Sequence, residues 1–241
     1  MRAAGAALSR IMEVVSFRFQ GFPPEARQFL RALRENNNRE WFKARKADYE
    51  RHVRQPLLQL VEEIGNSIPR YAPGYLQDPR KSVYRIYRDI RFSRNKQPYK
   101  TNAAAIFPPV GLPRHSAAGF YFHFSPEELL IGGGLYAPGS AELRRIRGRI
   151  AEDPDRLRGI LSDEAFARKF SGLEGKRLKG TPRGFRRDHP AADLLAFKQY
   201  LSGANFPAAE IEKPSIGDLI DGHFRILAPL LEYLNRPLRL S

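Results

Sequence analysis

The chain has 241 residues, 42% of them hydrophobic, and a formal net charge of +15. It contains no cysteine, which excludes disulfides, thiol nucleophiles and zinc sites with cysteine ligands. The positive charge favours polyanionic partners, or else it reflects a general use of arginine on the surface. No apolar run reaches the roughly 18 residues of a membrane span, so we expect a cytoplasmic protein without a membrane partner.

The length suits one large domain or two small ones, and we favour one because the sequence has no internal repeat and no long linker. We expect an α+β fold over residues 17–241, with an antiparallel sheet in the middle of the chain flanked by N-terminal and C-terminal helices. Residues 1–16 have too short an apolar stretch for a signal peptide, and we expect them to be a poorly ordered extension.

Helices are predicted in the first part of the chain. One follows Pro23-Pro24, because apolar residues recur there at helical spacing. A capping box of Asn37 and Glu40 predicts the start of a second helix. Pro56 should break or kink that helix, since proline has no amide donor.

A period of two residues then indicates strands. It predicts strands at 83–92, 119–124 and 129–131, with a weaker candidate at 103–107. The connections are too short for crossovers, so the sheet should be antiparallel. The run Gly132–Gly134 is not followed by the Lys-Ser/Thr of a phosphate-binding loop, and it favours a bend or a close packing contact.

Helical spacing returns at Ala141. It predicts helices near 143–150, after Asp153-Pro154 and at 163–170, then one led by Pro190. A last helix begins near Ser215, and Pro229 should kink it. A basic, glycine-rich loop, residues 172–187, lies between these helices.

The segment from Arg80 to Lys100 carries eight basic residues and one acidic residue, Asp89. On a strand, Arg88 would lie on the face of Tyr84, Ile86, Ile90 and Phe92. We therefore expect Arg88 to be largely buried and multiply hydrogen-bonded, because an unpaired buried charge is very costly. Asp89 and Arg91 would share the other face and could form an ion pair.

This segment has the residue types of an anion-binding site, because arginine recognises phosphate in a bidentate manner and lysine adds a point charge. Asp89 and Tyr99 are the candidate catalytic residues for proton transfer. Alternatively, the arginines form a hydrogen-bond network that only holds the segment in place. The candidate ligand-binding residues are Arg85, Arg88, Arg91, Lys96, Tyr99, Lys100 and, from the second basic loop, Arg183.

The pattern Arg85-x-x-Arg88-Asp89-x-Arg91-Phe92, followed by Asn95-Lys96-x-Pro98-Tyr99-Lys100-Thr101, resembles the signature of a bacterial family, domain of unknown function 2461. The resemblance extends from about Phe19 onward. The sequence departs from it at Asn95, where the family often has aspartate, and at Asn102, where it often has histidine. The resemblance implies no activity, so it leaves open whether the protein is an enzyme.

Three functions remain open. The first is binding of a phosphorylated small molecule or another anion through the arginine-rich segment. The second is association with nucleic acid through a broad basic surface that includes residues 144–149 and 176–187. The third is a structural or partner-binding module with internally paired arginines. No two histidines have metal-ligand spacing, so we expect no metal site and no cofactor, and the sequence indicates no oligomeric state.

Overall fold

The computed structural model describes residues 18–75 and 78–239, so the predicted extension at residues 1–16 lies outside the described residues. Four strands form one antiparallel sheet in the order β1-β2-β3-β4. They are β1 (Ala103–Phe107), β2 (Gly119–Phe124), β3 (Glu128–Leu135) and β4 (Tyr200–Pro207). Helices precede and follow the first three strands, which confirms the α+β prediction.

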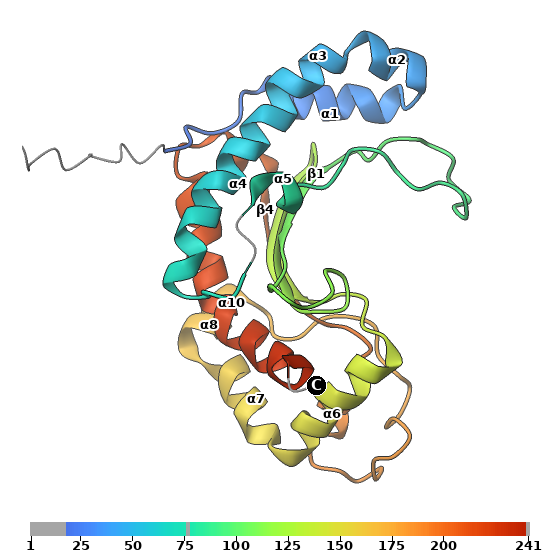
Figure 1. The fold of residues 1–241 in the computed structure, drawn as a ribbon, viewed down its shortest axis with the longest axis vertical. Helices are drawn as coiled ribbons and strands as arrows, with labels where there is room; N and C mark the ends of the chain where they lie inside the picture. The colour runs from blue at the N-terminus through green and yellow to red at the C-terminus, as the bar shows by residue number, and fades with distance from the viewer. Residues whose placement is uncertain (1–17, 76–77, 240–241) are drawn as a thin grey trace, which may run out of the picture.

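The N-terminal helices are α1 (Glu25–Glu35), α2 (Arg39–Ala44), α3 (Lys46–Asp48), α4 (Gln55–Ser67) and α5 (Pro79–Ser82), with a π-helical segment η1 (Tyr49–Arg54) and a 3-10 helix η2 (Ile68–Arg70). The later helices are α6 (Ser140–Glu152), α7 (Pro154–Ser162), α8 (Glu164–Lys169), α9 (Ala192–Leu195), the 3-10 helix η3 (Ala208–Glu212) and α10 (Ile216–Arg239). Together these elements form a crescent, with the sheet at its middle and a horn at either end (Figure 1).

Two local predictions in the N-terminal helices need correction. Asn38, not Asn37, caps α2, because its side chain accepts a hydrogen bond of 2.9 Å from the amide of Trp41. The helical stretch does not end at Pro56: its hydrogen-bond pattern changes there from π-helical to α-helical, and Pro56 lies in the first turn of α4. The Asn37 side chain instead hydrogen-bonds to the backbone of Tyr99.

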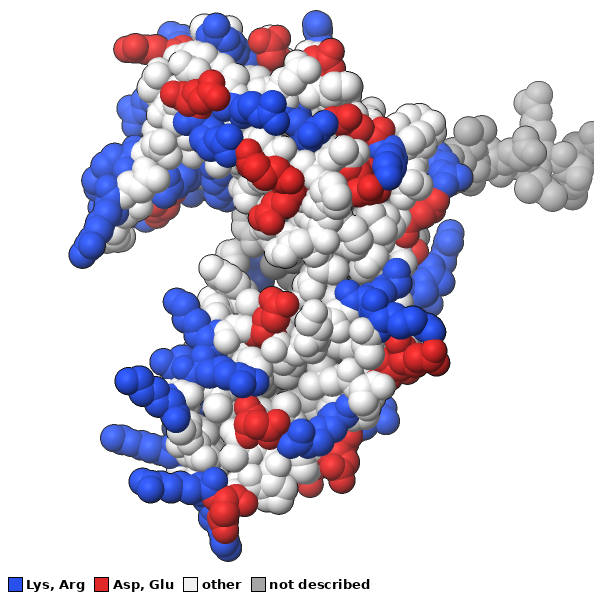
Figure 2. Space-filling view, turned by 180° about the vertical axis from the view of Figure 1, so that it is seen from behind, with Lys and Arg blue, Asp and Glu red and all other residues white. Residues whose placement is uncertain are grey.

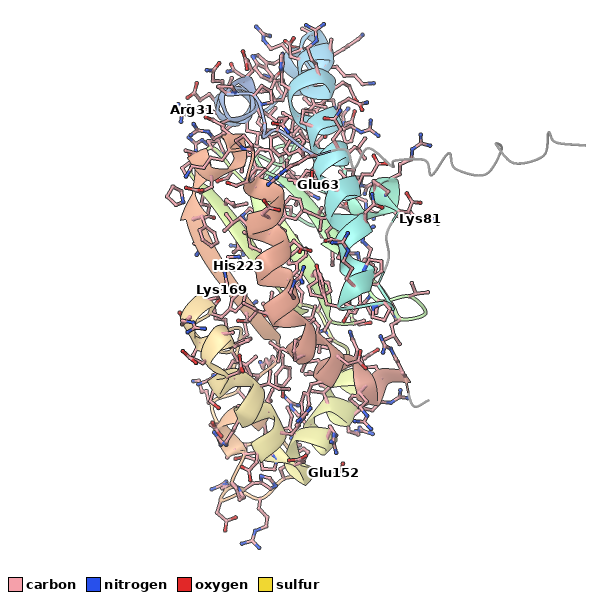
Figure 3. The ribbon with its side chains drawn as sticks, turned by 90° about the vertical axis from the view of Figure 1, so that its left-hand side faces the viewer. Arg31, Glu63, Lys81, Glu152, Lys169 and His223 are labelled. Carbon is pink, nitrogen blue, oxygen red and sulfur yellow. The ribbon has the colours of Figure 1, made fainter. Side chains whose placement is uncertain are left out.

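Helices cover one face of the sheet. Alternate residues of β2, namely Phe120, Phe122 and Phe124, are fully buried on this face. Helix α10 packs against β2 and β3, while α4 contacts β1, and both helices cross the convex side of the crescent (Figure 3). The other face of the sheet is turned toward the hollow of the crescent (Figure 1).

The prediction of a strand at 83–92 is wrong. Residues 83–102 form an irregular hairpin, here called the arm, which extends away from the sheet (Figure 1). Among the described residues, two isolated bridges hold the arm. Val83 pairs with Ala105 of β1 at its root, and Tyr87 pairs with Tyr99 between its two sides. Pro98 lacks an amide donor, and cations crowd both sides of the hairpin, so a regular ladder does not form.

The fourth strand, β4, was not predicted from the sequence. It pairs with β3 along its whole length, from Tyr200 opposite Leu135 to Pro207 opposite Glu128. Its segment contains Gly203 and Asn205, residues that are depleted in strands. Within the described residues, no helix is long and apolar enough to cross a membrane.

Candidate functional site

A cavity of about 520 Å³ lies on the open face of the sheet, in the hollow of the crescent. All four strands contribute to it, and the arm and the segment that precedes β2 form its sides. A second cavity of about 370 Å³ adjoins it and lies under the root of the arm. The two cavities share three lining residues, Lys100, Asn102 and His123.

Glycines form the floor of the larger cavity. Gly132 pairs with Gly203 on β4 and with Tyr121 on β2, while Gly134 pairs with Gly119. Gly134 has φ +127°, and a Cβ there would overlap the carbonyl oxygen of Tyr200. The run Gly132–Gly134 is therefore a close packing contact, as the sequence indicated, and it leaves a flat backbone surface open to the cavity.

Aromatic side chains stand around this floor. Tyr121 projects from β2, Tyr84 from the arm, and Tyr136 follows β3 at the rim, where it is 67% exposed. Burial raises the pKa of both Tyr84 and Tyr121, so both hydroxyls stay protonated at neutral pH. The cavity thus combines a flat floor with aromatic walls, which suits a ligand with a planar part.

Three cations gather where the arm meets the sheet. The Lys100 ammonium lies 4.7 Å from the ring centre of Tyr84, and the Arg114 guanidinium lies 4.8 Å from the same ring centre. Burial lowers the pKa of Lys100, and the charges of Arg85 and Arg114 lower it further. None of the three forms an ion pair with the carboxylates of residues 18–75 and 78–239. Positive charge at this end of the cavity is therefore not neutralised within the described protein.

Arg114 is held rigidly. Its two terminal nitrogens donate to the carbonyl oxygens of Lys81, at 2.7 Å, and Ser82, at 3.2 Å. Its Nε is buried and has no hydrogen-bond partner among the described residues. The guanidinium is thus fixed in place by backbone carbonyls, and its charge is not cancelled.

The smaller cavity contains a histidine–carboxylate pair. His123 Nε2 lies 3.6 Å from Glu128 Oε1, across neighbouring strands. Burial lowers the pKa of His123, although Glu128 partly opposes this shift. The imidazole is therefore largely neutral at pH 7. Asn95 and Asn102, the two positions where the sequence departs from the resemblance noted above, also line this cavity.

The structure brings only some of the predicted site residues together. Arg88, Tyr99 and Lys100 line the smaller cavity. Arg88 is half-buried rather than largely buried, because the arm is not a sheet strand with an apolar face. It donates to the carbonyl oxygen of Gln97 at 3.2 Å and, at 3.5 Å, to the Ser93 hydroxyl. The Tyr99 ring is buried and stacks on Phe42 at 4.2 Å.

The other predicted residues lie outside both cavities. Asp89 and Arg91 form the expected ion pair at 2.7 Å, on the exposed part of the arm. Hydrogen bonds from Arg91 lower the pKa of Asp89 to about 2, so Asp89 is a poor proton acceptor. Lys96 donates to the carbonyl oxygen of Ile90 on the arm, and Arg183 is exposed in the second basic loop.

Sequence reasoning missed Arg114, Tyr121 and Glu128. Tyr121 and His123 alternate with three buried phenylalanines in β2, so the strand pattern already placed both on one face. The pattern does not show that this face is left uncovered by helices. Arg114 lies in a loop that showed no signal.

Comparisons with known proteins give a family and no named activity. Residues 25–233 match a family described as "Conserved hypothetical protein (DUF2461)". The match spans most of the helices and the whole sheet, with the arm and both cavities inside it. A search of curated proteins found no match.

Proposed function

Because the chain belongs to the DUF2461 family of conserved hypothetical proteins, we propose its function from the geometry of the open sheet face, as the binding of a phosphorylated small molecule. The observation that carries this proposal is the pair of cations, Lys100 and Arg114, that line one end of the glycine-floored cavity, with Arg85, which lines neither cavity, near enough to Lys100 to lower its pKa. Their like charges repel one another, and an anion would relieve that repulsion. Charge-assisted hydrogen bonds to phosphate are stronger than neutral ones.

The rest of the cavity suits the remainder of such a ligand. A planar group fits between Tyr121 and Tyr136 and lies against the backbone at Gly132 and Gly203. Glu174, on the opposite rim from the arm, is the acidic residue of the larger cavity, and it would accept hydrogen bonds from a polar edge of the ligand. The phosphate therefore belongs at the arm and the planar part over the sheet.

Calorimetric titration with inorganic phosphate and with a nucleoside monophosphate tests this proposal. Lys100→Gln should weaken binding of both probes by about tenfold, because it removes a charge-assisted contact. Lys169→Gln is the matched control, since Lys169 is an exposed lysine of α8 on the convex side (Figure 3). This control should bind as tightly as the unsubstituted protein.

A second variant changes the shape of the cavity without changing its charge. A Cβ at Gly203, which lines the larger cavity, would meet only ordinary contacts, the closest at 3.8 Å from the Ile131 carbonyl oxygen. Gly203→Leu should therefore fold normally and fill part of the cavity, which should weaken the nucleotide more than inorganic phosphate. The proposal is wrong if neither probe binds, or if Lys100→Gln and Lys169→Gln have equal effects.

A further inference from the structure

Basic side chains extend well beyond the cavity, on both horns of the crescent. The arm carries Arg94 and Lys96 toward its tip, and both are exposed. On the other horn, the loop 172–187 borders the cavity, because Glu174 pairs with Leu201 of the cavity lining. The exposed basic residues of this loop are Lys176, Arg177, Lys179, Arg183, Arg186 and Arg187. Seen from behind, basic side chains fringe both horns beside the hollow (Figure 2).

Few carboxylates neutralise these fringes. In the loop 172–187 the single acidic residue is Glu174, and in residues 83–102 it is Asp89. Asp89 is already paired with Arg91, and Asp188 beyond the loop is paired with Arg186. Two basic clusters on opposite sides of one cavity exceed what a single phosphate group needs.

Exposed rings accompany these cations. Four large apolar side chains of the described residues are exposed, and three of them are aromatic: Tyr87 at 49%, Phe92 at 95% and Tyr136 at 67%. Tyr87 and Phe92 belong to the arm, while Tyr136 lies at the cavity rim. The Arg91 guanidinium lies 5.8 Å from the ring centre of Phe92. Rings interleaved with cations are typical of surfaces on which unpaired bases stack.

We propose that this site also binds a single-stranded nucleic acid, which runs from the arm across the open sheet face to the loop 172–187. This inference rests on the proposed function, because Lys100 and Arg114 would hold one phosphate of the strand. The cations of the two horns hold the phosphates on either side, and Phe92 and Tyr136 stack on bases. A duplex fits less well, because its bases already stack on one another and cannot use the exposed rings.

Fluorescence anisotropy with a labelled oligothymidine of about 20 nucleotides tests this inference. The logarithm of the affinity should fall linearly with the logarithm of salt concentration, by about 0.7 per phosphate contacted. Phe92→Leu and Tyr136→Leu should each weaken binding by about tenfold, because a base loses its stacking partner. Tyr136→Phe keeps the ring and should bind like the unsubstituted protein. Both tyrosine substitutions are at an exposed position, so they should leave the melting temperature unchanged.

The outcomes separate the two proposals. If phosphate and the nucleotide bind in a Lys100-dependent way but the oligonucleotide does not, the small-molecule site stands and the nucleic-acid inference is overturned. The inference is also overturned if a duplex of the same length binds equally well, or if the leucine variants keep full affinity. Binding to anionic lipid vesicles that survives Phe92→Leu, without oligonucleotide binding, would point to a membrane surface instead.

Discussion

Lys100 occupies a position where the local arrangement of charges costs stability. Its ammonium is partly buried beside two other cations, and its pKa falls for that reason. A lysine selected for stability alone would have a carboxylate neighbour, since burying an unpaired charge is costly. The sequence made Lys100 a candidate binding residue because of its basic surroundings, but not Arg114, which comes from the loop between β1 and β2.

Asn235 gives the clearest stability prediction at the scale of a residue. It is fully buried on α10. Its Oδ1 accepts a hydrogen bond from the Ala118 amide at 2.8 Å. Its Nδ2 donates to the Ala118 carbonyl oxygen at 2.8 Å and to the Tyr75 hydroxyl at 3.0 Å. Asn235→Ala leaves these groups without partners, and we expect a loss of about 3 kcal/mol of unfolding free energy. Urea denaturation measures it. The exposed Asn205→Ala should change stability by less than about 0.5 kcal/mol, and an equal effect of the two substitutions would contradict this account.

At the scale of elements, the sequence predicted three of the four strands and most of the helices. Strands β1 to β3 have buried residues on alternate positions or continuous apolar runs, so local pattern was sufficient. Strand β4 has Ser202, Gly203 and Asn205 among its apolar residues, which obscures the strand pattern, and its pairing with β3 is a long-range contact that no local pattern encodes. For residues 83–92 the local pattern predicted a strand that does not form. Tyr84, Ile86, Ile90 and Phe92 alternate as in a strand, although only Ile86 of these four is buried.

One side chain from the connection between α1 and α2 holds the root of the arm. Asn37 accepts from the Tyr99 amide and donates to the Tyr99 carbonyl, both at 3.0 Å, so its amide group acts as a partner strand would. Asn37→Ala removes both bonds. We expect a loss of about 1–2 kcal/mol and faster hydrogen exchange at the Arg88 and Lys100 amides, which close the arm.

The neighbouring residue supplies the control for this experiment. Among the described residues, the Asn36 side chain donates to the Ala32 carbonyl oxygen at 2.9 Å and makes no bond to the arm, so Asn36→Ala should leave exchange in the arm unchanged. Amides of β2 and β3 should keep their protection in both variants. Unchanged exchange at Arg88 and Lys100 in Asn37→Ala would show that the arm is held by its aromatic contacts instead, chiefly the stacking of Tyr99 on Phe42.

At the scale of the whole molecule, the net charge of +15 must be accommodated in a crescent whose cations gather along both horns (Figure 2). Many arginines elsewhere are paired, such as Arg27 with Glu212 and Arg158 with Asp193. The cations around the hollow are the group with fewer partners among the described residues. Composition alone could give the size of this charge but not its location, since the location follows from the arrangement of the two horns around the sheet.

This arrangement predicts how stability responds to salt. Sodium chloride screens the repulsion among exposed like charges, with a Debye length near 10 Å at 0.1 M, so the melting temperature should rise between low and moderate ionic strength. Each kcal/mol gained corresponds to about 2–4 °C for a chain of this size.

Arg85→Gln should raise the melting temperature at low salt and reduce its salt dependence, because Arg85 lies near Lys100 and forms no ion pair within the described residues. Arg168→Gln is the contrasting variant, since it breaks the exposed ion pair with Glu164 and should bring no such gain. A melting temperature that falls with added salt, or that responds alike to both substitutions, would mean that the hollow is not the place where the repulsion is concentrated.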